Sequence, residues 1–264
     1  MNAVILAGAK AAELGRHSIQ GGYRAGLVIG GRSLLDQALC ALSALPDLDR
    51  VVLVGPDDLA ASEYRAMLTE VVAPGEDLVE NLRRGLSVLP PEEQALVVAS
   101  DLPLLTRAAL SDFIQSCAKR PAEIHYPIIR RETYEAAYPG SLRTYLTLRD
   151  GTFTGGNIVL LTPAAFYRHE HWIATAVAWR KNPRRLGRLL GLGFFLGLRC
   201  RRYSVADLEA RVAARLGVQA VAVETRFSEI GFDVDSDADV DWIDFYWGGS
   251  IEGTGLGNRE PDEE

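Results

Sequence analysis

The sequence contains few cysteines and few lysines. Its three cysteines, Cys40, Cys117 and Cys200, are far apart, odd in number and form no CxxC pair. This spacing suits a reducing compartment, with the thiols acting as packing residues. Only three of the 28 basic residues are lysines, so arginine carries most of the positive charge.

Net positive charge and long apolar runs are also missing. The formal net charge is −7 at pH 7, which argues against a nucleic-acid partner because polyanion binding relies on a basic surface. The first ten residues have no basic leader and too short an apolar run for a signal peptide. The apolar stretch 189–198 is too short to span a bilayer. We therefore expect a cytoplasmic protein that binds no nucleic acid.

The composition is that of a globular α/β domain. The chain has 264 residues, of which 48% are hydrophobic and 24% charged, enough for one large domain with a sizeable core. We predict a single domain over residues 1–247 with a helical, apolar and basic insertion near 183–203. The glycine-rich, acidic segment 248–264 is expected to be disordered.

Strand and helix patterns alternate along the first hundred residues. Short apolar runs at 3–7, 50–55 and 95–100 end in small or polar residues, as buried parallel strands do. Helical patterns with leucines at three- and four-residue spacing begin at Ser33 and Asp77. We predict a three-layer α/β/α sandwich with a doubly wound, mostly parallel sheet. Ligands of such sheets bind beyond the carboxyl ends of the strands.

Three loops follow these predicted strands and are the first candidates for chemistry. One contains Gly8, where backbone N–H groups could approach a phosphate. Its sequence, "LAGAKAAELG", matches neither GxxxxGK[ST] nor GxGxxG, so a plain strand-to-helix turn remains an alternative. The second loop contains Asp57 and Asp58, and the third contains Asp101.

Asp101 lies in "VVASDLPLLT", directly after a buried strand. A carboxylate at this position can hold a divalent cation that bridges phosphate oxygens. The alternative role is to cap the helix that follows, but Thr106 is placed to do so. The pattern therefore favours metal binding.

Four aspartates are closely spaced in "GFDVDSDADV". Bringing carboxylates together is costly unless a cation or hydrogen-bond donors neutralise them. Asp237 and Asp239 fit the first turn of a final helix, where they would favour its dipole. Asp233 and Asp235 precede that helix and alternate along an extended segment, so we expect them to point to one face.

Two further stretches permit either a binding role or a structural one. "TGGN", residues 154–157, places glycines at the entrance of a predicted strand, which suggests close approach of a ligand, and offers Asn157 as both donor and acceptor, although a tight turn also explains the glycines. The leucine- and arginine-rich stretch 186–200 could contact a lipid or a membrane surface, or pack against the main domain.

The order of these segments resembles that of nucleotidyltransferases with a GT-A-type, Rossmann-like fold, nearest the molybdenum cofactor guanylyltransferase-like (MobA-like) branch. The similar stretches are "LAGA", "YRAGLVIGGRSLLDQAL", "PGEDLVENLRRGL", "VVASDLPLLT", "TGGNIVLL" and "GFDVDSDADV". They occur in family order over roughly residues 1–245.

The resemblance implies a function and a set of site residues. Such enzymes transfer a nucleoside monophosphate from an NTP to a phosphorylated acceptor, release pyrophosphate and use magnesium. Asp101, Asp233 and Asp235 would bind Mg²⁺, Asp101 and Arg24 would be catalytic, and Asn157 would face the acceptor. The nucleotide-binding residues would be Leu6, Ala7, Gly8, Ala9, Gly75 and Asn81.

The first loop departs from the family pattern LAGGxGxRMG. Ala9 replaces the second glycine, and Glu13 lies near the position of the arginine. Arg24 replaces a lysine, which keeps the charge but changes a point charge into a planar fork.

The sequence therefore predicts a magnesium-dependent nucleotidyltransferase that binds an NTP and a phosphorylated small molecule. The altered loop leaves open a degenerate, nucleotide-binding regulator or scaffold without catalysis. A glycosyltransferase that uses a nucleotide-sugar is a further alternative, but it would need a DxD motif where this chain has "SDLP".

Overall fold

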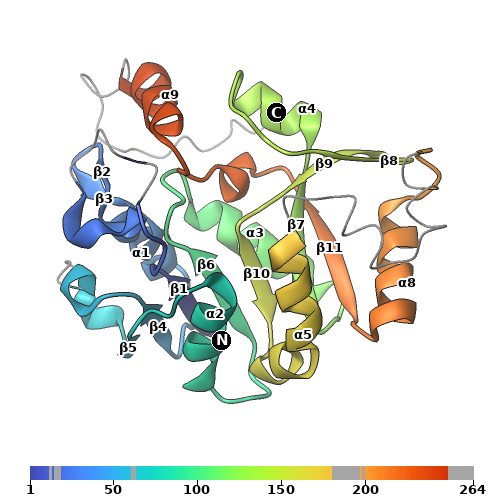
Figure 1. Ribbon diagram of the computed structural model, residues 1–264, viewed down its shortest axis with the longest axis horizontal. Coiled ribbons are helices and arrows are strands. Elements are labelled where there is room, and N and C mark those ends of the chain that lie inside the picture. Colours follow the sequence, from blue (N-terminus) through green and yellow to red (C-terminus); the bar gives the residue numbers. More distant parts are fainter. Residues whose placement is uncertain (12–13, 15–18, 61–63, 180–196, 198–199, 249–264) are drawn as a thin grey trace.

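The computed structural model describes residues 1–11, 14, 19–60, 64–179, 197 and 200–248 (Figure 1). A mixed sheet of nine strands forms the centre of this part of the chain. Its order is β5-β4-β1-β6-β10-β7-β9-β8, and β11 also pairs with β7. The strands are β1 (Asn2–Leu6), β4 (Val51–Val54), β5 (Glu70–Val72), β6 (Ala95–Ala99), β7 (Ile124–Arg130), β8 (Leu146–Leu148), β9 (Gly151–Gly155), β10 (Ile158–Leu161) and β11 (Ala220–Thr225). A separate small sheet pairs β2 (Val28–Ile29) with β3 (Arg32–Ser33).

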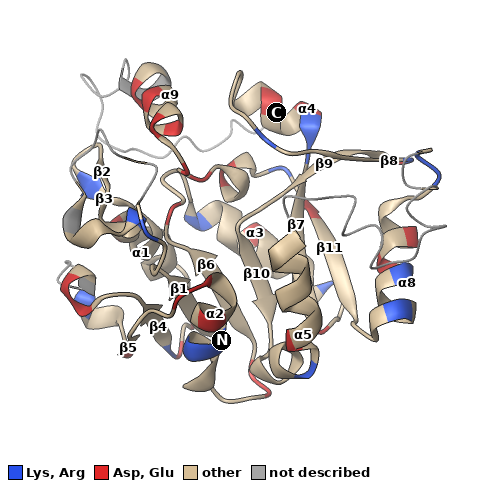
Figure 2. Ribbon diagram, viewed as in Figure 1, with Lys and Arg blue, Asp and Glu red and all other residues tan. Residues whose placement is uncertain are grey.

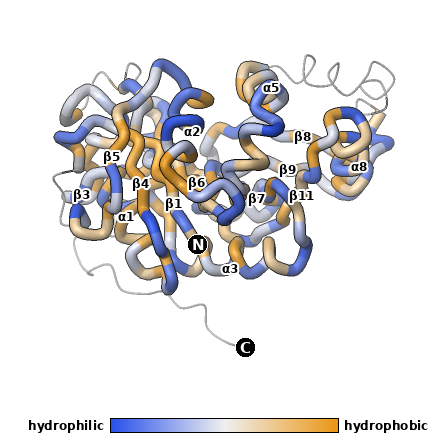
Figure 3. The backbone as a smooth tube through the Cα atoms, turned by 90° about the horizontal axis from the view of Figure 1, so that it is seen from below, coloured by the Kyte–Doolittle hydropathy of each residue, from blue (hydrophilic) through white to orange (hydrophobic). Residues whose placement is uncertain are grey.

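Helices lie on both faces of the large sheet (Figure 1, Figure 3). The α-helices are α1 (Leu34–Ser43), α2 (Leu78–Ser87), α3 (Arg107–Ala118), α4 (Arg131–Ala137), α5 (Pro163–Trp179), α8 (Val205–Leu216) and α9 (Asp237–Gly248). Short 3₁₀ helices are η1 (Gln20–Gly22), η2 (Arg24–Gly26), η3 (Asp57–Ala60), η4 (Arg65–Met67) and η5 (Ser228–Gly231). Seen edge-on, α2 and α5 lie above the sheet and α1 and α3 below it (Figure 3).

The alternation of side chains along β1 creates the two halves of the core. Ala3 and Ile5 are fully buried in the cluster that contains residues of α1 and α3. Val4 is fully buried in the cluster that contains residues of α2 and α5. Because successive strand residues point to opposite faces, this strand, which is apolar from Ala3 to Leu6, lies between two helical layers. The predicted α/β sandwich with a mostly parallel sheet is confirmed.

Polar side chains begin the helices where the sequence indicates. The side chain of Ser33 accepts a hydrogen bond from the Asp36 N–H at the start of α1, and Asp77 does the same for α2. The Thr106 hydroxyl accepts the Ala109 N–H at the start of α3. Each oxygen satisfies a backbone donor that has no partner within its helix. Thr106 thus performs the capping role, and Asp101 does not.

The predicted strand that is entered through the glycines of "TGGN" is present as β10, but the residues before the interruption form a separate strand, β9, which ends at Gly155. Strands β9 and β10 both run antiparallel to β7, but β9 also pairs with β8 whereas β10 pairs with β6. The interruption falls at Gly156 and Asn157. A Cβ at Gly156 would lie 2.6 Å from Ile230 Cγ2, so only glycine fits this close approach. The break places Asn157 beside the end of β6, where its carbonyl accepts the Ala99 N–H at 3.1 Å.

The order in which successive strands are added to the sheet changes direction at β1. From β1 the chain proceeds outward to β4 and β5, then returns to β6 on the other side of β1. The Ser100 N–H donates to the Leu6 carbonyl at 3.2 Å, which joins the ends of the two strands. Ligands of open α/β sheets bind at such a switch point.

Several sequence predictions concern residues outside the described part. Most of the stretch 186–200 and of the predicted insertion 183–203 falls within 180–196 and 198–199. The predicted tail 248–264 falls within 249–264 except for its first residue, Gly248, which ends α9. In the part of the chain that the structure does describe, no helix is both long and apolar enough to cross a membrane.

Candidate metal and nucleotide site

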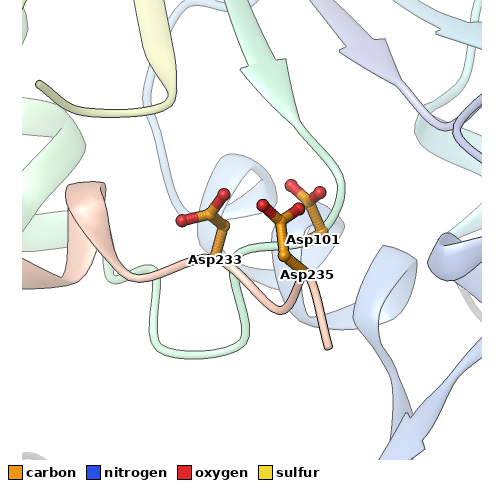
Figure 4. A group of neighbouring side chains, drawn as sticks. All are labelled: Asp101, Asp233 and Asp235. Carbon is orange, nitrogen blue, oxygen red and sulfur yellow. The ribbon is translucent and has the colours of Figure 1, made fainter. Parts of the chain in front are cut away.

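Three carboxylates from distant parts of the sequence meet beyond the end of β6. Asp101 follows that strand, and Asp233 and Asp235 lie on the segment between η5 and α9 (Figure 4). One oxygen from each group lies within 4.8 Å of the others. Asp101 and Asp233 are largely buried, whereas the Asp235 side chain is 50% exposed. The prediction that Asp233 and Asp235 point to one face is consistent with this cluster. Further acidic residues follow along α9 (Figure 2).

Backbone and capping hydrogen bonds bring the two segments together. The Val234 N–H donates to the Asp101 carbonyl at 3.0 Å. The Thr106 hydroxyl donates to Oε1 of Glu229 at 2.8 Å, which links the start of α3 to η5. Burial raises the pKa of Glu229, and its hydrogen bond with Thr106 partly opposes that rise. The position of Asp233 and Asp235 is therefore fixed by the loop that carries Asp101.

Two arginines neutralise part of the cluster's charge. Nη1 of Arg24 donates to Oδ2 of Asp101 at 3.3 Å and to Oδ1 of Asp235. Nη1 of Arg143 pairs with Oδ1 of Asp233. Three carboxylates thus face two guanidinium groups, which leaves an excess of negative charge when all are ionised.

The electrostatic environment favours protons or cations at this position. Burial raises the pKa of Asp101 to about 7, and the charges of Asp233 and Asp235 raise it while Arg24 lowers it. Burial also raises the pKa of Asp233, with Arg143 opposing. Burial lowers the pKa of Arg24, but its pairing with Asp235 and Asp101 outweighs burial and raises it.

The donor set fits a small, hard divalent cation. Mg²⁺ binds oxygen ligands at about 2.0–2.1 Å and commonly uses one or two protein carboxylates together with water and phosphate oxygens. Carboxylate oxygens of Asp101, Asp233 and Asp235 are close enough together to surround such an ion. An additional cation would relieve the repulsion that raises the pKa of Asp101.

Asn157 lies on the side of the cluster nearest Asp233. Its side-chain amide lowers the pKa of Asp233, although Nδ2 is buried and has no hydrogen-bond partner of normal geometry among the described residues. Its N–H donates to the Ile230 carbonyl at 2.9 Å and its carbonyl accepts from Ala99 at 3.1 Å. The backbone is therefore fixed, while the amide has unused donor capacity.

On the other side of Asp101, the loop after β1 contacts the loop before α2. The Asn81 side chain is buried, and its Oδ1 accepts the Gly75 N–H at 2.6 Å. A Cβ at Gly8 would lie 2.7 Å from Nδ2 of Asn81 and 2.9 Å from Cβ of Pro74. The predicted nucleotide-binding residues Gly8, Gly75 and Asn81 are thus in one place, and the glycine at position 8 is explained by this packing. Leu6 is the last residue of β1, and Ala7 and Ala9 lie in the loop that follows it.

The loop after β1 also holds the backbone of Arg24. The Arg24 N–H donates to the Ala9 carbonyl at 2.9 Å, and Lys10 and Tyr23 form a bridge between the two segments. Nζ of Lys10 lies 3.8 Å from the centroid of the Tyr23 ring, a cation–π contact. Glu13 lies outside the described residues.

Other acidic candidates from the sequence do not join the cluster. Asp57 is highly exposed and lies 3.9 Å from Arg65. Asp239 accepts hydrogen bonds from the Asp235 and Ser236 N–H groups, so it organises the start of α9. Its expected place in the first turn of that helix is confirmed.

Arg143 is the residue that the sequence did not indicate. Besides pairing with Asp233, its guanidinium donates to the Gly155 carbonyl at 2.7 Å and lies over the Tyr134 ring at 5.5 Å. Nε donates to Oγ1 of Thr154 at 3.4 Å. No motif surrounds it, and only its contacts with distant strands identify it.

Comparisons with known proteins give the family and the fold of the chain. The model of the MobA-like NTP transferase domain matches residues 3–190. A hypothetical transferase from Thermus thermophilus has 36% sequence identity and a TM-score of 0.78, and the match covers 90% of this chain and 98% of that one. A search among curated proteins gave no match.

Two structures with lower sequence identity share the fold. 4-Diphosphocytidyl-2C-methyl-D-erythritol synthase from Anaerococcus prevotii is 13% identical, with a TM-score of 0.57 over 94% of this chain and 95% of that one. The bifunctional IspDF from Campylobacter jejuni is also 13% identical, with a TM-score of 0.54 over 92% of this chain and 53% of that one. Both similarities indicate a common Rossmann-like architecture.

Proposed function

The chain belongs to the family of MobA-like NTP transferase domains, and we propose that it transfers a nucleoside monophosphate from an NTP to a phosphorylated small molecule, with release of pyrophosphate. The observation that carries the proposal is the cluster of Asp101, Asp233 and Asp235 at the switch point of the sheet. This cluster lies beside the loop after β1, in which the Ala9 carbonyl accepts a hydrogen bond from the Arg24 N–H.

In this proposal the three carboxylates hold Mg²⁺. The bound ion would neutralise charge on the phosphate oxygens of the NTP. The Arg24 guanidinium supplies further positive charge to the triphosphate, which lies along the loop at Gly8 and Ala9. Attack on the α-phosphate places charge on its oxygens, so positioning and cations provide most of the catalysis. No protein nucleophile is required.

The two sides of the cluster receive different substrates. The Gly75–Asn81 contact shapes the surface for the base and ribose of the NTP. Asn157 lies on the opposite side, beside Asp233, where its buried amide is able to donate to a phosphate of the acceptor. An ionised phosphate oxygen of the acceptor then attacks the α-phosphorus from that side, the bond between this phosphorus and the bridging oxygen to the β-phosphate breaks, and pyrophosphate leaves toward the loop after β1.

Nucleotide binding without catalysis is the second candidate function. It is favoured by Ala9 in the first loop and by the pairs of Arg24 with Asp101 and Asp235, which neutralise part of the charge of the cluster without a metal. Transfer from a nucleotide-sugar is disfavoured, because Leu102 and Pro103 follow Asp101 and both are buried.

Calorimetry with ATP, GTP, CTP and UTP, each with and without Mg²⁺, tests the proposal. Asp101→Ala is the test variant and Asp112→Ala, on α3, is the control. We expect one nucleotide to bind in a magnesium-dependent manner, with loss of binding only in Asp101→Ala. Pyrophosphate release with a panel of phosphorylated acceptors separates transfer from binding alone. Absence of binding for all four nucleotides would refute a nucleotide site.

Lipid contact through residues 186–200 is a separate hypothesis that depends on composition alone. Binding of the purified protein to anionic liposomes is the direct test. Failure to bind them or lipid phosphates would remove a lipid from the possible acceptors.

A further inference from the structure

Arg24 occupies the space between two of the proposed metal ligands. Its Nη1 atom is within hydrogen-bonding distance of Oδ2 of Asp101 and Oδ1 of Asp235. The side chain of Arg24 is only 22% exposed and that of Asp101 only 14%, so this pair is shielded from solvent, whereas Asp235 is half exposed. A single guanidinium nitrogen thus bridges the two carboxylates as a bound cation would.

We propose that Arg24 and a divalent cation exclude one another at Asp101 and Asp235, and that Arg24 turns to the triphosphate when the cation binds. This inference rests on the proposed function, since it assumes that the carboxylates bind a metal and the adjacent loop binds phosphates. It adds a coupling role: one side chain transmits metal binding to nucleotide binding.

The distances make simultaneous occupancy unfavourable. A magnesium ion would lie about 2.0–2.1 Å from each ligand oxygen. The same two oxygens now accept hydrogen bonds from Nη1 of Arg24. A cation shared by these oxygens would therefore lie beside the guanidinium, where like charges repel and the carboxylate lone pairs would be used twice.

The backbone of Arg24 is fixed, so the exchange requires movement of the side chain alone. The Arg24 N–H donates a hydrogen bond to the Ala9 carbonyl, and the Leu27 N–H donates one to the Arg24 carbonyl, both at 2.9 Å. Ala25 and Gly26 are buried. Because the anchoring partner, Ala9, belongs to the proposed phosphate loop, a guanidinium released from the carboxylates remains next to the triphosphate.

Arg143 shows what an arginine with only a structural role looks like in the same site. It pairs with Asp233, but it also donates to the carbonyl of Gly155 and to the hydroxyl of Thr154. Within the described part of the chain, the hydrogen bonds of the Arg24 side chain go to Asp101 and Asp235. Arg143 is thus bound by the scaffold, whereas Arg24 is bound by the groups that the metal would take.

The first experiment measures Mn²⁺ binding without nucleotide, by electron paramagnetic resonance of the free ion. It compares the wild type with Arg24→Gln, Arg24→Lys and the control Lys10→Gln, which removes one positive charge from the neighbouring loop. We expect Arg24→Gln to bind Mn²⁺ about 10-fold more tightly. Arg24→Lys should be intermediate, and Lys10→Gln should stay within about 2-fold of the wild type. Equal or weaker binding by Arg24→Gln would overturn the exclusion.

The second experiment repeats the titration with a non-hydrolysable analogue of the NTP that binds. In the wild type the analogue draws Arg24 away and thereby increases Mn²⁺ affinity. In Arg24→Gln this increase should be smaller, because no guanidinium has to leave. An equal increase in both proteins would overturn the coupling. Absence of nucleotide binding in the wild type would refute the proposed function, while the first experiment still decides the exclusion. Thermal melts confirm that each variant is folded.

Discussion

The Val234 N–H donates a hydrogen bond to the Asp101 carbonyl at 3.0 Å. This contact joins the loop after β6 to the segment before α9, two parts of the chain that are distant in sequence. The side chains on either side of it, Asp101, Asp233 and Asp235, form the carboxylate cluster. Because the link is between backbone atoms, substitution of an aspartate changes the chemistry of the site without removing the connection.

Asp101→Asn should stabilise the metal-free protein at alkaline pH. The pKa of Asp101 rises with burial from 3.8 to about 7, so the folded state binds the proton more tightly than the unfolded state. The stabilisation that results from this tighter proton binding is fully present below about pH 4 and is lost as the pH rises through 7. Asparagine is uncharged at every pH. In EDTA we expect Asp101→Asn to raise Tm by roughly 5 °C at pH 8 and by less at pH 5.

The control for this measurement is Asp57→Asn, whose carboxylate is 86% exposed. It should leave Tm within about 1 °C of the wild type at both pH values, as is usual for surface substitutions. Parallel Tm–pH curves for wild type and Asp101→Asn would contradict the assignment of a buried, proton-binding carboxyl group.

Asn81→Ala should reduce nucleotide affinity together with stability. The substitution removes the acceptor of the Gly75 N–H, and an unsatisfied buried donor costs about 1–3 kcal/mol. Calorimetry with the nucleotide and urea unfolding measure the two effects. Ser87→Ala, which removes an exposed hydroxyl at the end of the same helix, serves as the control. Unchanged nucleotide affinity in Asn81→Ala would show that the hydrogen bond between Gly75 and Asn81 does not contribute to nucleotide binding.

Thr106→Val should weaken metal binding although Thr106 is not a ligand. It removes both the cap of α3 and the hydrogen bond to Glu229, which connects the Asp101 loop to η5. Ser204→Ala is matched to it, because Ser204 caps α8, away from the cluster. Both variants should lower Tm by about 2–4 °C. Only Thr106→Val should lower Mn²⁺ affinity, and an equal loss in Ser204→Ala would show that lower stability alone is responsible.

Arg143→Met should be far more destabilising than Arg131→Met. Both arginines pair with a carboxylate and lie over a tyrosine ring, Arg143 over Tyr134 and Arg131 over Tyr145. Arg143 is only 16% exposed, and loss of it leaves Asp233 buried without its partner, at a cost of about 3 kcal/mol. Arg131 is 53% exposed, so its pair with Glu135 is worth less than about 1 kcal/mol. Similar unfolding free energies of the two variants would contradict this difference.

Local patterns in the sequence were sufficient to predict much of the architecture. Leucine spacing and the polar residues Ser33 and Asp77 predicted α1 and α2, because caps and apolar faces act within one helical turn. Asp101 was identifiable because it follows a buried strand and Thr106 already caps the next helix.

Features that depend on long-range packing could not be predicted. The separation of β9 from β10 results from the close approach of Gly156 to Ile230 and from the different partners of each strand. Arg143 lies in a stretch without any motif, and its partner Asp233 is far along the chain. The pairing of Arg24 with Asp101 and Asp235 also needs the fold to bring the three residues together.

The late position of β11 and of the segment that follows it sets the order in which the site is completed during synthesis. Residues 220–225 pair with β7, and only then does the chain return to Asp101 through Val234. A nascent chain that has grown to residue 232 carries Arg24 and Asp101 but neither of the other two carboxylates. Almost the whole domain must therefore be synthesised before the three carboxylates of the proposed metal site can come together, and a chain that ends at residue 232 lacks two of them.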